Sequence, residues 1–310
     1  GLSVRTSLNL EWQNVAQEII RSQSPEDIEG ALISIEPRTG LVRVLVGGKN
    51  YEQNQFNRGT QALRSTGSTF KIFPYAAALT AGFTPDQKIL DLPRCWADYC
   101  PKNFGNKYMG RVSISDSFKY SLNSVAVSLV EEVGFNSVIE TANKLGVGTD
   151  SDLGSYYSLA IGASEHTVLE MTGAYAGITN RGIFVMPSPF EEIRGPDNNI
   201  LWNHKEDHPP GERALSREVA DNMNFMLQKV VESGTGIAAY LQSRPVAGKT
   251  GTSEKARDLW FIGSIPQLTT GVWLGHDNNK PTRKGSGDAA KVWSDFMYQI
   301  ESGFEIQQFK

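Results

Sequence analysis

Three short motifs occur in a fixed order along this chain of 310 residues. They are Ser68-Thr69-Phe70-Lys71, then Ser121-Leu122-Asn123, then Lys249-Thr250-Gly251-Thr252. Each is weak alone, because strings this short occur by chance in most chains of this length. Together they supply a nucleophile, groups that transfer protons and a strand that can hold an anion, which indicates acyl transfer. A site that uses all three requires segments 53 and 128 positions apart to meet in the fold.

The first motif opens an apolar, alanine-rich run, 72–81, that ends at Gly82. Such a run predicts a buried helix with a glycine stop. Ser68 would lie in its first turn, where free N–H groups and the helix dipole favour developing negative charge. Lys71 would project from the same face and could take the serine proton if its pKa is lowered. The alternative is a serine cap followed by a solvated lysine.

The second motif falls between two helical patterns. The hydroxyl of Ser121 could relay a proton to a leaving group, and the amide of Asn123 could hold a substrate carbonyl or Lys71. The alternative is a helix cap.

The third motif follows the apolar residues Val246 and Ala247 and predicts a strand. Lys249 and the hydroxyls of Thr250 and Thr252 suit a carboxylate anchor. We expect Gly251 to let a ligand approach the strand backbone closely. The alternative is a turn that contains a lysine.

The joint occurrence of the motifs overturns these alternatives, because serine β-lactamases and penicillin-binding proteins carry this set. The chain resembles the transpeptidase domain of a class A, high-molecular-weight penicillin-binding protein. The resemblance runs along nearly the whole chain and also covers segments 5–13, 55–60, 64–68, 101–104, 234–236 and 258–263.

The resemblance implies a role for each motif residue. Ser68 would be the acylated nucleophile and Lys71 its general base, with a pKa lowered by burial and by Lys249. Ser121 would pass a proton to the leaving amine, and Asn123 would orient the substrate. The terminal carboxylate of the substrate would be held by the third motif, Lys249, Thr250, Gly251 and Thr252. The backbone N–H groups of Ser68 and Thr252 would form the oxyanion hole.

The implied activity is that of a peptidoglycan DD-transpeptidase. The serine would be acylated by a D-Ala-D-Ala stem peptide, releasing D-Ala, and the acyl group would pass to an amine of a neighbouring peptide. The implied partners are peptidoglycan stem peptides and β-lactam antibiotics, with no cofactor or metal. The implied location is the extracytoplasmic face of the bacterial cytoplasmic membrane, in a parent with an upstream membrane anchor and glycan-polymerising domain.

Three rival functions share this chemistry. A class A β-lactamase would need a water-activating Glu some 36 positions past Ser121, where this chain has Tyr157 and no carboxylate within 155–159. A non-catalytic β-lactam sensor would resemble class D lactamases and carry an aromatic-Gly-Asn motif. We recognise no such motif, and segment 258–263 also argues against the sensor. A DD-carboxypeptidase, which transfers the acyl group to water, stays open.

The composition of the chain excludes few further functions or partners. With 39% hydrophobic residues the chain can bury one sizeable core or two closely joined ones. A net charge of −4 gives no support for nucleic acid or an anionic membrane surface as partner. We find no signal peptide and no run near 18 apolar residues, and expect a fragment because the chain starts at Gly1. Metal-ligand spacing is absent among the histidines, His166, His204, His208 and His276.

Cys95 and Cys100 stand five positions apart. Two sulfurs without nearby histidine are too few for a structural zinc site. The choice is between a local disulfide, which we favour for an extracytoplasmic protein, and two reduced thiols.

The patterns predict an α+β fold of the serine β-lactamase/DD-transpeptidase type, with an antiparallel sheet flanked by helices and a mostly helical inserted subdomain. Residues 1–28 would form a linker strand and helix, and 29–310 the transpeptidase domain. Within that domain, 68–232 would be mostly helical, and 29–67 would join 233–310 in the sheet. Predicted strands are 31–35, 41–46, 245–252, 258–265 and 271–275; predicted terminal helices are 10–22 and 288–302; predicted loops are 91–110, 149–157 and 187–211.

Overall fold

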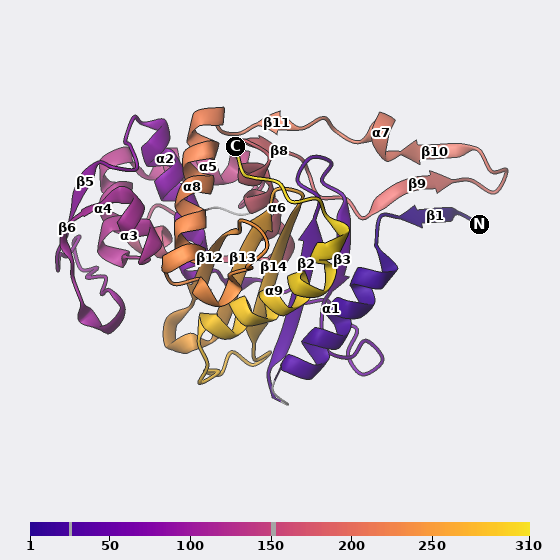
Figure 1. Ribbon diagram of the computed structural model, residues 1–310, viewed down its shortest axis with the longest axis horizontal. Helices are drawn as coiled ribbons and strands as arrows, with labels where there is room; N and C mark the ends of the chain where they lie inside the picture. Colours follow the sequence, from indigo (N-terminus) through magenta and orange to yellow (C-terminus); the bar gives the residue numbers. More distant parts are fainter. Residues whose placement is uncertain (25–26, 150–152) are drawn as a thin grey trace.

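A five-stranded antiparallel sheet lies at the centre of the computed structural model, which describes residues 1–24, 27–149 and 153–310 (Figure 1). Strands from the two ends of the chain meet inside it, with Leu32 opposite Val272. This pairing confirms the predicted sheet. Its strands, in spatial order, are β12 (Ala247–Thr252), β13 (Asp258–Ile265), β14 (Leu268–Gly275), β2 (Glu29–Ile35) and β3 (Val42–Val46).

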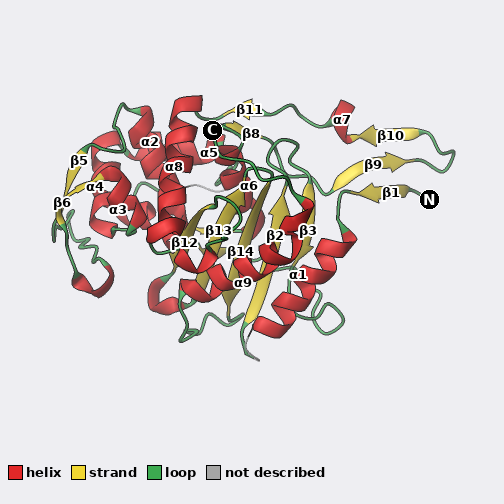
Figure 2. Ribbon diagram, in the orientation of Figure 1, coloured by secondary structure: helices red, strands yellow, loops and turns green. Residues whose placement is uncertain are grey.

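Apolar side chains alternate between the two faces of this sheet, because successive residues of a strand point to opposite sides. Leu32 and Phe261 belong to a core shared with α1 (Leu10–Gln23) and α9 (Ser286–Ile300), which cover one face. Their chain neighbours Ile33 and Trp260 belong to a larger core on the other face. The helices drawn in Figure 2 therefore sandwich the sheet, with α6 (Val168–Thr179) and α8 (Arg217–Ser233) on the second face.

The predicted helical part packs onto that second face. It holds a 3₁₀ turn, η1 (Gly67–Lys71), that leads directly into a buried helix, α2 (Ile72–Thr80). Pro74 is tolerated because it lies in the first turn of α2. Further helices of this part are α3 (Ile114–Lys119), α4 (Asn123–Val133), α5 (Phe135–Lys144) and the 3₁₀ turn η3 (Tyr157–Ile161).

The predicted loop 91–110 is confirmed apart from its two end residues and one short turn, whereas the predicted loop 187–211 contains two strands and a helix, so that prediction was wrong. The first is bounded by a pair, β5 (Lys88–Asp91) with β6 (Gly110–Ser113), and contains the turn η2 (Phe104–Asn106). The second contains β9 (Phe190–Arg194), β10 (Ile200–Asn203) and the short helix α7 (His204–Asp207). The third predicted loop, 149–157, lies partly outside the described residues.

The strands missed in 187–211, β9 and β10, pair with each other, and β9 also pairs with a strand from far away in the sequence. β9 pairs with β1 (Ser3–Thr6), the first strand of the chain, and Arg5 forms an ion pair with Glu191 at 3.2 Å. A pattern read locally cannot reveal such a partner. Smaller pairs elsewhere join β4 (Arg64–Ser65) to β7 (Glu165–His166), and β8 (Ile183–Phe184) to β11 (Glu212–Arg213).

Segment 1–28 is tied to the rest of the molecule through both of its elements. Its strand β1 pairs with β9, and Ala16, Ile19 and Ile20 of its helix are buried against the sheet. The division of the chain at residue 28 stays a prediction. Among the described residues, we find no helix whose length and apolar character would let it cross a bilayer.

Cys95 and Cys100 are joined by a disulfide, with their Cα atoms 4.2 Å apart. The ring that they close also carries paired backbone hydrogen bonds between Trp96 and Tyr99. We therefore expect no free thiol when the unreduced protein is unfolded and titrated with a thiol reagent, and two after reduction. Two free thiols before reduction would contradict the assignment.

Candidate active site

The three motifs meet at one end of the central sheet, beside a cleft of about 750 Å³. Gly67, Asn123 and Thr252, one from or next to each motif, line this cleft. Segments far apart in the sequence therefore form one site. The spacing of the motifs alone left open how they would be arranged.

Ser68 lies in η1, where 3₁₀ geometry places residues three apart on the same side, so its side chain projects from the same side as that of Lys71. A very close approach to β12 holds this turn in place. Gly67 has a positive φ of 50°, and a Cβ there would lie only 2.5 Å from the carbonyl oxygen of Thr252. Ser68 is half-buried and does not cap the turn, whose N-cap is Thr66.

Gly251 has a packing role that the sequence did not indicate. A Cβ at this position would lie 2.6 Å from the carbonyl oxygen of Thr66 and 2.8 Å from the side chain of Thr69. The nucleophile-bearing turn of the chain itself therefore approaches the strand closely at this glycine, and the close approach of a ligand there stays a prediction. Close packing of β12 on η1 is what requires the glycine.

Lys71 is fully buried, which excludes the solvated-lysine alternative. Its Nζ lies 2.6 Å from the backbone oxygen of Ser121, 2.6 Å from Oδ1 of Asn123 and 3.2 Å from Oγ of Ser121. The first two partners can only accept hydrogen bonds. Lys71 therefore donates to both, whichever charge it carries.

Ser121 connects the two buried lysines of the site. Its Oγ lies 2.9 Å from Nζ of Lys249 and 3.2 Å from Nζ of Lys71. Its backbone is left-handed, with a φ of 57°, which is unusual for a residue with a side chain. The hydroxyl does not cap a helix, because the N-cap of α4 is Leu122. A serine held between two amines can pass a proton from one to the other.

Burial sets the charges of this lysine pair. It lowers the pKa of Lys71 well below the usual value, the ammonium of Lys249 lowers it further, and the carboxylate of Asp91 opposes the change. Burial also lowers the pKa of Lys249 to about 7. Because two adjacent buried cations repel each other, a protonated Lys249 favours the neutral form of Lys71. A neutral Lys71 beside a protonated Lys249 is the arrangement in which Lys249 donates to Ser121 and Ser121 donates to Lys71.

The other residues of the third motif differ in exposure. Thr250 is buried, and its hydroxyl shares a hydrogen bond of 2.7 Å with that of Thr235. Thr252 is exposed at the end of β12, beside the cleft. Thr235 belongs to segment 234–236, which resembles the family but to which the sequence assigned no role.

Two further contacts of the second motif were also missed. Nδ2 of Asn123 donates to the backbone oxygen of Lys102 at 2.7 Å, and its backbone N–H donates to Oδ1 of Asn103 at 2.7 Å. Both partners lie in segment 101–104, whose resemblance to the family was the available signal.

The cleft contains carboxylates that bear on the rival functions. Tyr157 and its neighbours provide none, as expected, but Glu165 and Glu254 line the cleft and are exposed. The chain does contain one aromatic-Gly-Asn string, Phe104-Gly105-Asn106, so the statement that it has no such motif was wrong. It forms the turn η2, is not part of the cleft wall, and has a fully exposed Phe104. It therefore gives the sensor alternative no support.

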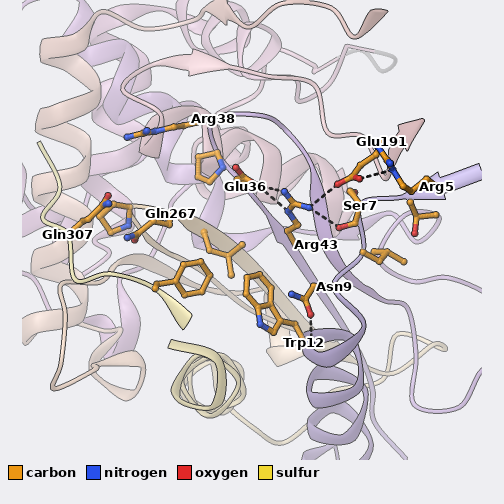
Figure 3. Close-up of a pocket in the computed structure, with 16 residues that line it drawn as sticks. Arg5, Ser7, Asn9, Trp12, Glu36, Arg38, Arg43, Glu191, Gln267 and Gln307 are labelled. Atoms are coloured by element: carbon orange, nitrogen blue, oxygen red, sulfur yellow. Dashed lines mark hydrogen bonds and ion pairs between the residues drawn. The ribbon is translucent and has the colours of Figure 1, made fainter. Parts of the chain in front are cut away.

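A second cavity, of about 620 Å³, lies away from the motifs, between the first residues of the chain and the β2–β3 turn (Figure 3). Its charged groups are largely paired, since Arg43 contacts Glu36 at 2.6 Å and Glu191 at 3.3 Å. This network attaches the start of the chain to the sheet. No motif residue is among the described residues that line it. In the described part of the chain, no group of three or more His, Cys, Asp or Glu side chains could hold a metal ion.

Comparison with known proteins agrees with this geometry. Residues 30–298 match the family described as the penicillin binding protein transpeptidase domain. Penicillin-binding protein 1A of Aquifex aeolicus is 36% identical over 299 residues, which are 94% of this chain and 40% of that protein. Penicillin-binding protein 1F of Bacillus subtilis is 30% identical over 96% of this chain and 43% of its own length. The chain thus spans about two fifths of these relatives, and the resemblance found in the sequence is confirmed.

Solved structures confirm the predicted fold class. The penicillin-binding protein PonA1 of Mycobacterium tuberculosis superimposes with a TM-score of 0.91 over all of this chain and 88% of that chain, at 24% identity. PonA1 has also been solved in complex with penicillin V, with the same score.

Proposed function

This chain belongs to the penicillin-binding protein transpeptidase family, and from that membership we propose that it is a serine D-Ala-D-Ala transpeptidase that cross-links peptidoglycan stem peptides. The observation that carries the proposal is the pair of buried lysines bridged by Ser121, in which burial and the ammonium of Lys249 lower the pKa of Lys71 well below its usual value. A neutral amine beside a serine-bearing turn is what nucleophilic attack at neutral pH requires.

Acylation begins with the proton of Ser68. Neutral Lys71 accepts it while Oγ attacks the carbonyl carbon of the penultimate D-Ala. The backbone N–H groups of Ser68 and Thr252 face the developing oxyanion, the type of interaction that contributes most in acyl transfer. The close packing of Gly67 against Thr252 supports this, because it brings the two backbones together.

Release of D-Ala needs a proton on its nitrogen. Ser121 gives up its hydroxyl proton to the leaving amine and is reprotonated by Lys71, which passes on the proton taken from Ser68 and becomes neutral again. Asn123 keeps Lys71 in place through the 2.6 Å contact and orients the substrate. The acyl group then passes to an amine of a second stem peptide, and Lys71 acts again as base.

Acylation and deacylation by a labelled penicillin test this proposal. We expect one equivalent of label to bind rapidly and stay bound for many minutes, because the position of the lactamase glutamate is held by Tyr157. Continuous turnover of penicillin would contradict the transpeptidase and indicate a β-lactamase that uses Glu165 or Glu254. A protein that takes up no label would contradict acyl transfer altogether.

We further predict a pH optimum set by the carboxylate anchor. The ammonium of Lys249, with Thr250 and Thr252, would hold the carboxylate shared by β-lactams and stem peptides. The pKa of Lys249 is lowered to about 7, so its charge is present below that pH and is lost above it. The second-order acylation rate of a free-acid penicillin should therefore fall as the pH rises past about 7.

An esterified penicillin is the matched control for this anchor. It should acylate more slowly by roughly 10- to 100-fold at neutral pH, since a charged hydrogen bond is worth roughly 1.5–3 kcal/mol. An ester that reacts as fast as the acid would contradict the anchor.

The wider setting follows from the family and is also a proposal. The parent protein would carry a glycan-polymerising domain, and this domain would face the extracytoplasmic side of the bacterial cytoplasmic membrane. A fragment limited to these residues should not polymerise lipid-linked disaccharide, because 1–28 contribute one strand and one helix.

A further inference from the structure

The helix that carries Asn123 begins without a cap of its own. Its N-cap residue, Leu122, has no side-chain oxygen, so the free N–H groups of the first turn need a partner from elsewhere. Asn103 supplies it. Its Oδ1 accepts from the backbone N–H of Asn123 at 2.7 Å and from that of Ser124 at 3.2 Å.

A buried carboxylate holds Asn103 in this orientation. Nδ2 of Asn103 donates to Oδ1 of Asp91 at 2.7 Å, and both residues are almost fully buried, at 4% and 0% exposure. Asp91 also accepts from the hydroxyl of Ser124 and, at 2.7 Å, from the backbone N–H of Met109. Because a carboxylate only accepts hydrogen bonds, it forces the NH₂ end of the amide toward itself and leaves the oxygen for the helix.

The neighbouring residue completes the arrangement. The backbone oxygen of Lys102 accepts from Nδ2 of Asn123 at 2.7 Å, which turns Oδ1 of Asn123 toward Lys71. Residues 102 and 103 therefore fix both the side chain and the backbone of Asn123. The disulfide at Cys100, which lines the cleft, anchors the same loop two residues earlier.

We propose that Asp91 and Asn103 are positioning residues for acyl transfer: they set where α4 begins and so hold Ser121 and Asn123 against Lys71. The inference rests on the proposed function. Neither residue is expected to touch substrate, since both are buried behind the second motif.

The charge of Asp91 gives the proposal a distinctive signature. Two charged groups shift the pKa of the buried Lys71: Lys249 from β12 lowers it, and Asp91 from β5 raises it. Burial raises the pKa of Tyr75 in α2, and the charge of Asp91 adds to that shift. The carboxylate favours the protonated form of Lys71. Removing the carboxylate should make Lys71 lose its proton at a lower pH. A plot of acylation rate against pH falls on its acidic side as Lys71 becomes protonated, and this acidic limb should therefore shift toward lower pH.

The test compares labelled-penicillin acylation of the wild type with that of Asp91→Asn and Asn103→Leu across pH. We expect Asn103→Leu to slow acylation by roughly 10- to 100-fold, because two N–H groups at the helix start lose their acceptor. Asp91→Asn should slow acylation and also move the acidic limb to lower pH. In the double variant the acylation rate should fall by less than the product of the two single-variant fold-reductions, since Asp91 and Asn103 act as a unit.

Asp98→Asn is the matched control, because it removes an exposed carboxylate from the same loop. It should leave rate and pH profile unchanged. The positioning role would be overturned if Asp91→Asn kept the wild-type acylation rate and pH profile, or if the fold-reductions of the two single variants multiplied in the double variant. It would also be overturned if Asp91→Asn had a lower melting temperature but an acidic limb at the wild-type pH. A wild type that takes up no label would instead refute the proposed function.

Discussion

Replacing Ser68 by alanine will abolish covalent capture of penicillin. The serine is the one nucleophile of the first motif, and alanine removes only its oxygen from a turn whose position depends on the close contacts of Gly67 and Gly251. The fold should therefore survive, with a melting temperature near that of the wild type. Mass spectrometry of the trapped wild type should place the added mass on the peptide that contains Ser68.

The matched control is Ser65→Ala, three residues earlier. Its hydroxyl donates to the backbone oxygen of Gly162 at 2.9 Å and supports the entry to the turn. This variant should still form the adduct, even if more slowly. An undiminished adduct in Ser68→Ala would show that another residue is the nucleophile.

Replacing Lys71 by alanine will slow acylation by roughly 10²- to 10⁴-fold, the usual contribution of a positioned base. The pKa of Lys71 is lowered by burial and by Lys249, so Lys71 stays neutral at pH values at which an exposed lysine would be protonated. In the wild type, acylation should fall as the pH drops through this lowered pKa. In the alanine variant that acidic limb should be lost along with the rate.

Lys205→Ala is a suitable control, since Lys205 lies in the exposed helix α7 far along the chain from the motifs. It should acylate at the wild-type rate and with the same pH profile. A Lys71→Ala protein that kept the wild-type rate and limb would mean that the base is another group.

Strong local patterns made the central sheet and the motif residues predictable. β13 is eight residues long and fully buried, and its apolar run was predicted at full length. The prediction for β14 covered only 271–275 and missed the first three residues, which include two threonines. The burial of Lys71 also followed from its position at the start of an apolar helix. These features depend on residues close together in the sequence.

Features that depend on a distant partner could not be predicted. β9 reads Phe-Glu-Glu-Ile-Arg, a charged segment that pairs with β10 on one side and, on the other, with β1 from the start of the chain. The cap that Asn103 provides for α4 comes from 20 positions upstream, and no spacing rule for helix caps includes such a residue. The role of Gly251 depends on which segment packs against it, which only the fold reveals.

The most direct test of the central claim uses a stem pentapeptide that ends in D-Ala-D-Ala, with and without an amine acceptor peptide. The proposal predicts that D-Ala is released in step with a cross-linked product when the acceptor is present, and that little tetrapeptide forms. Ser68→Ala should give neither product. Release of D-Ala with tetrapeptide as the only product, at a rate that the acceptor does not change, would contradict the transpeptidase and identify a carboxypeptidase.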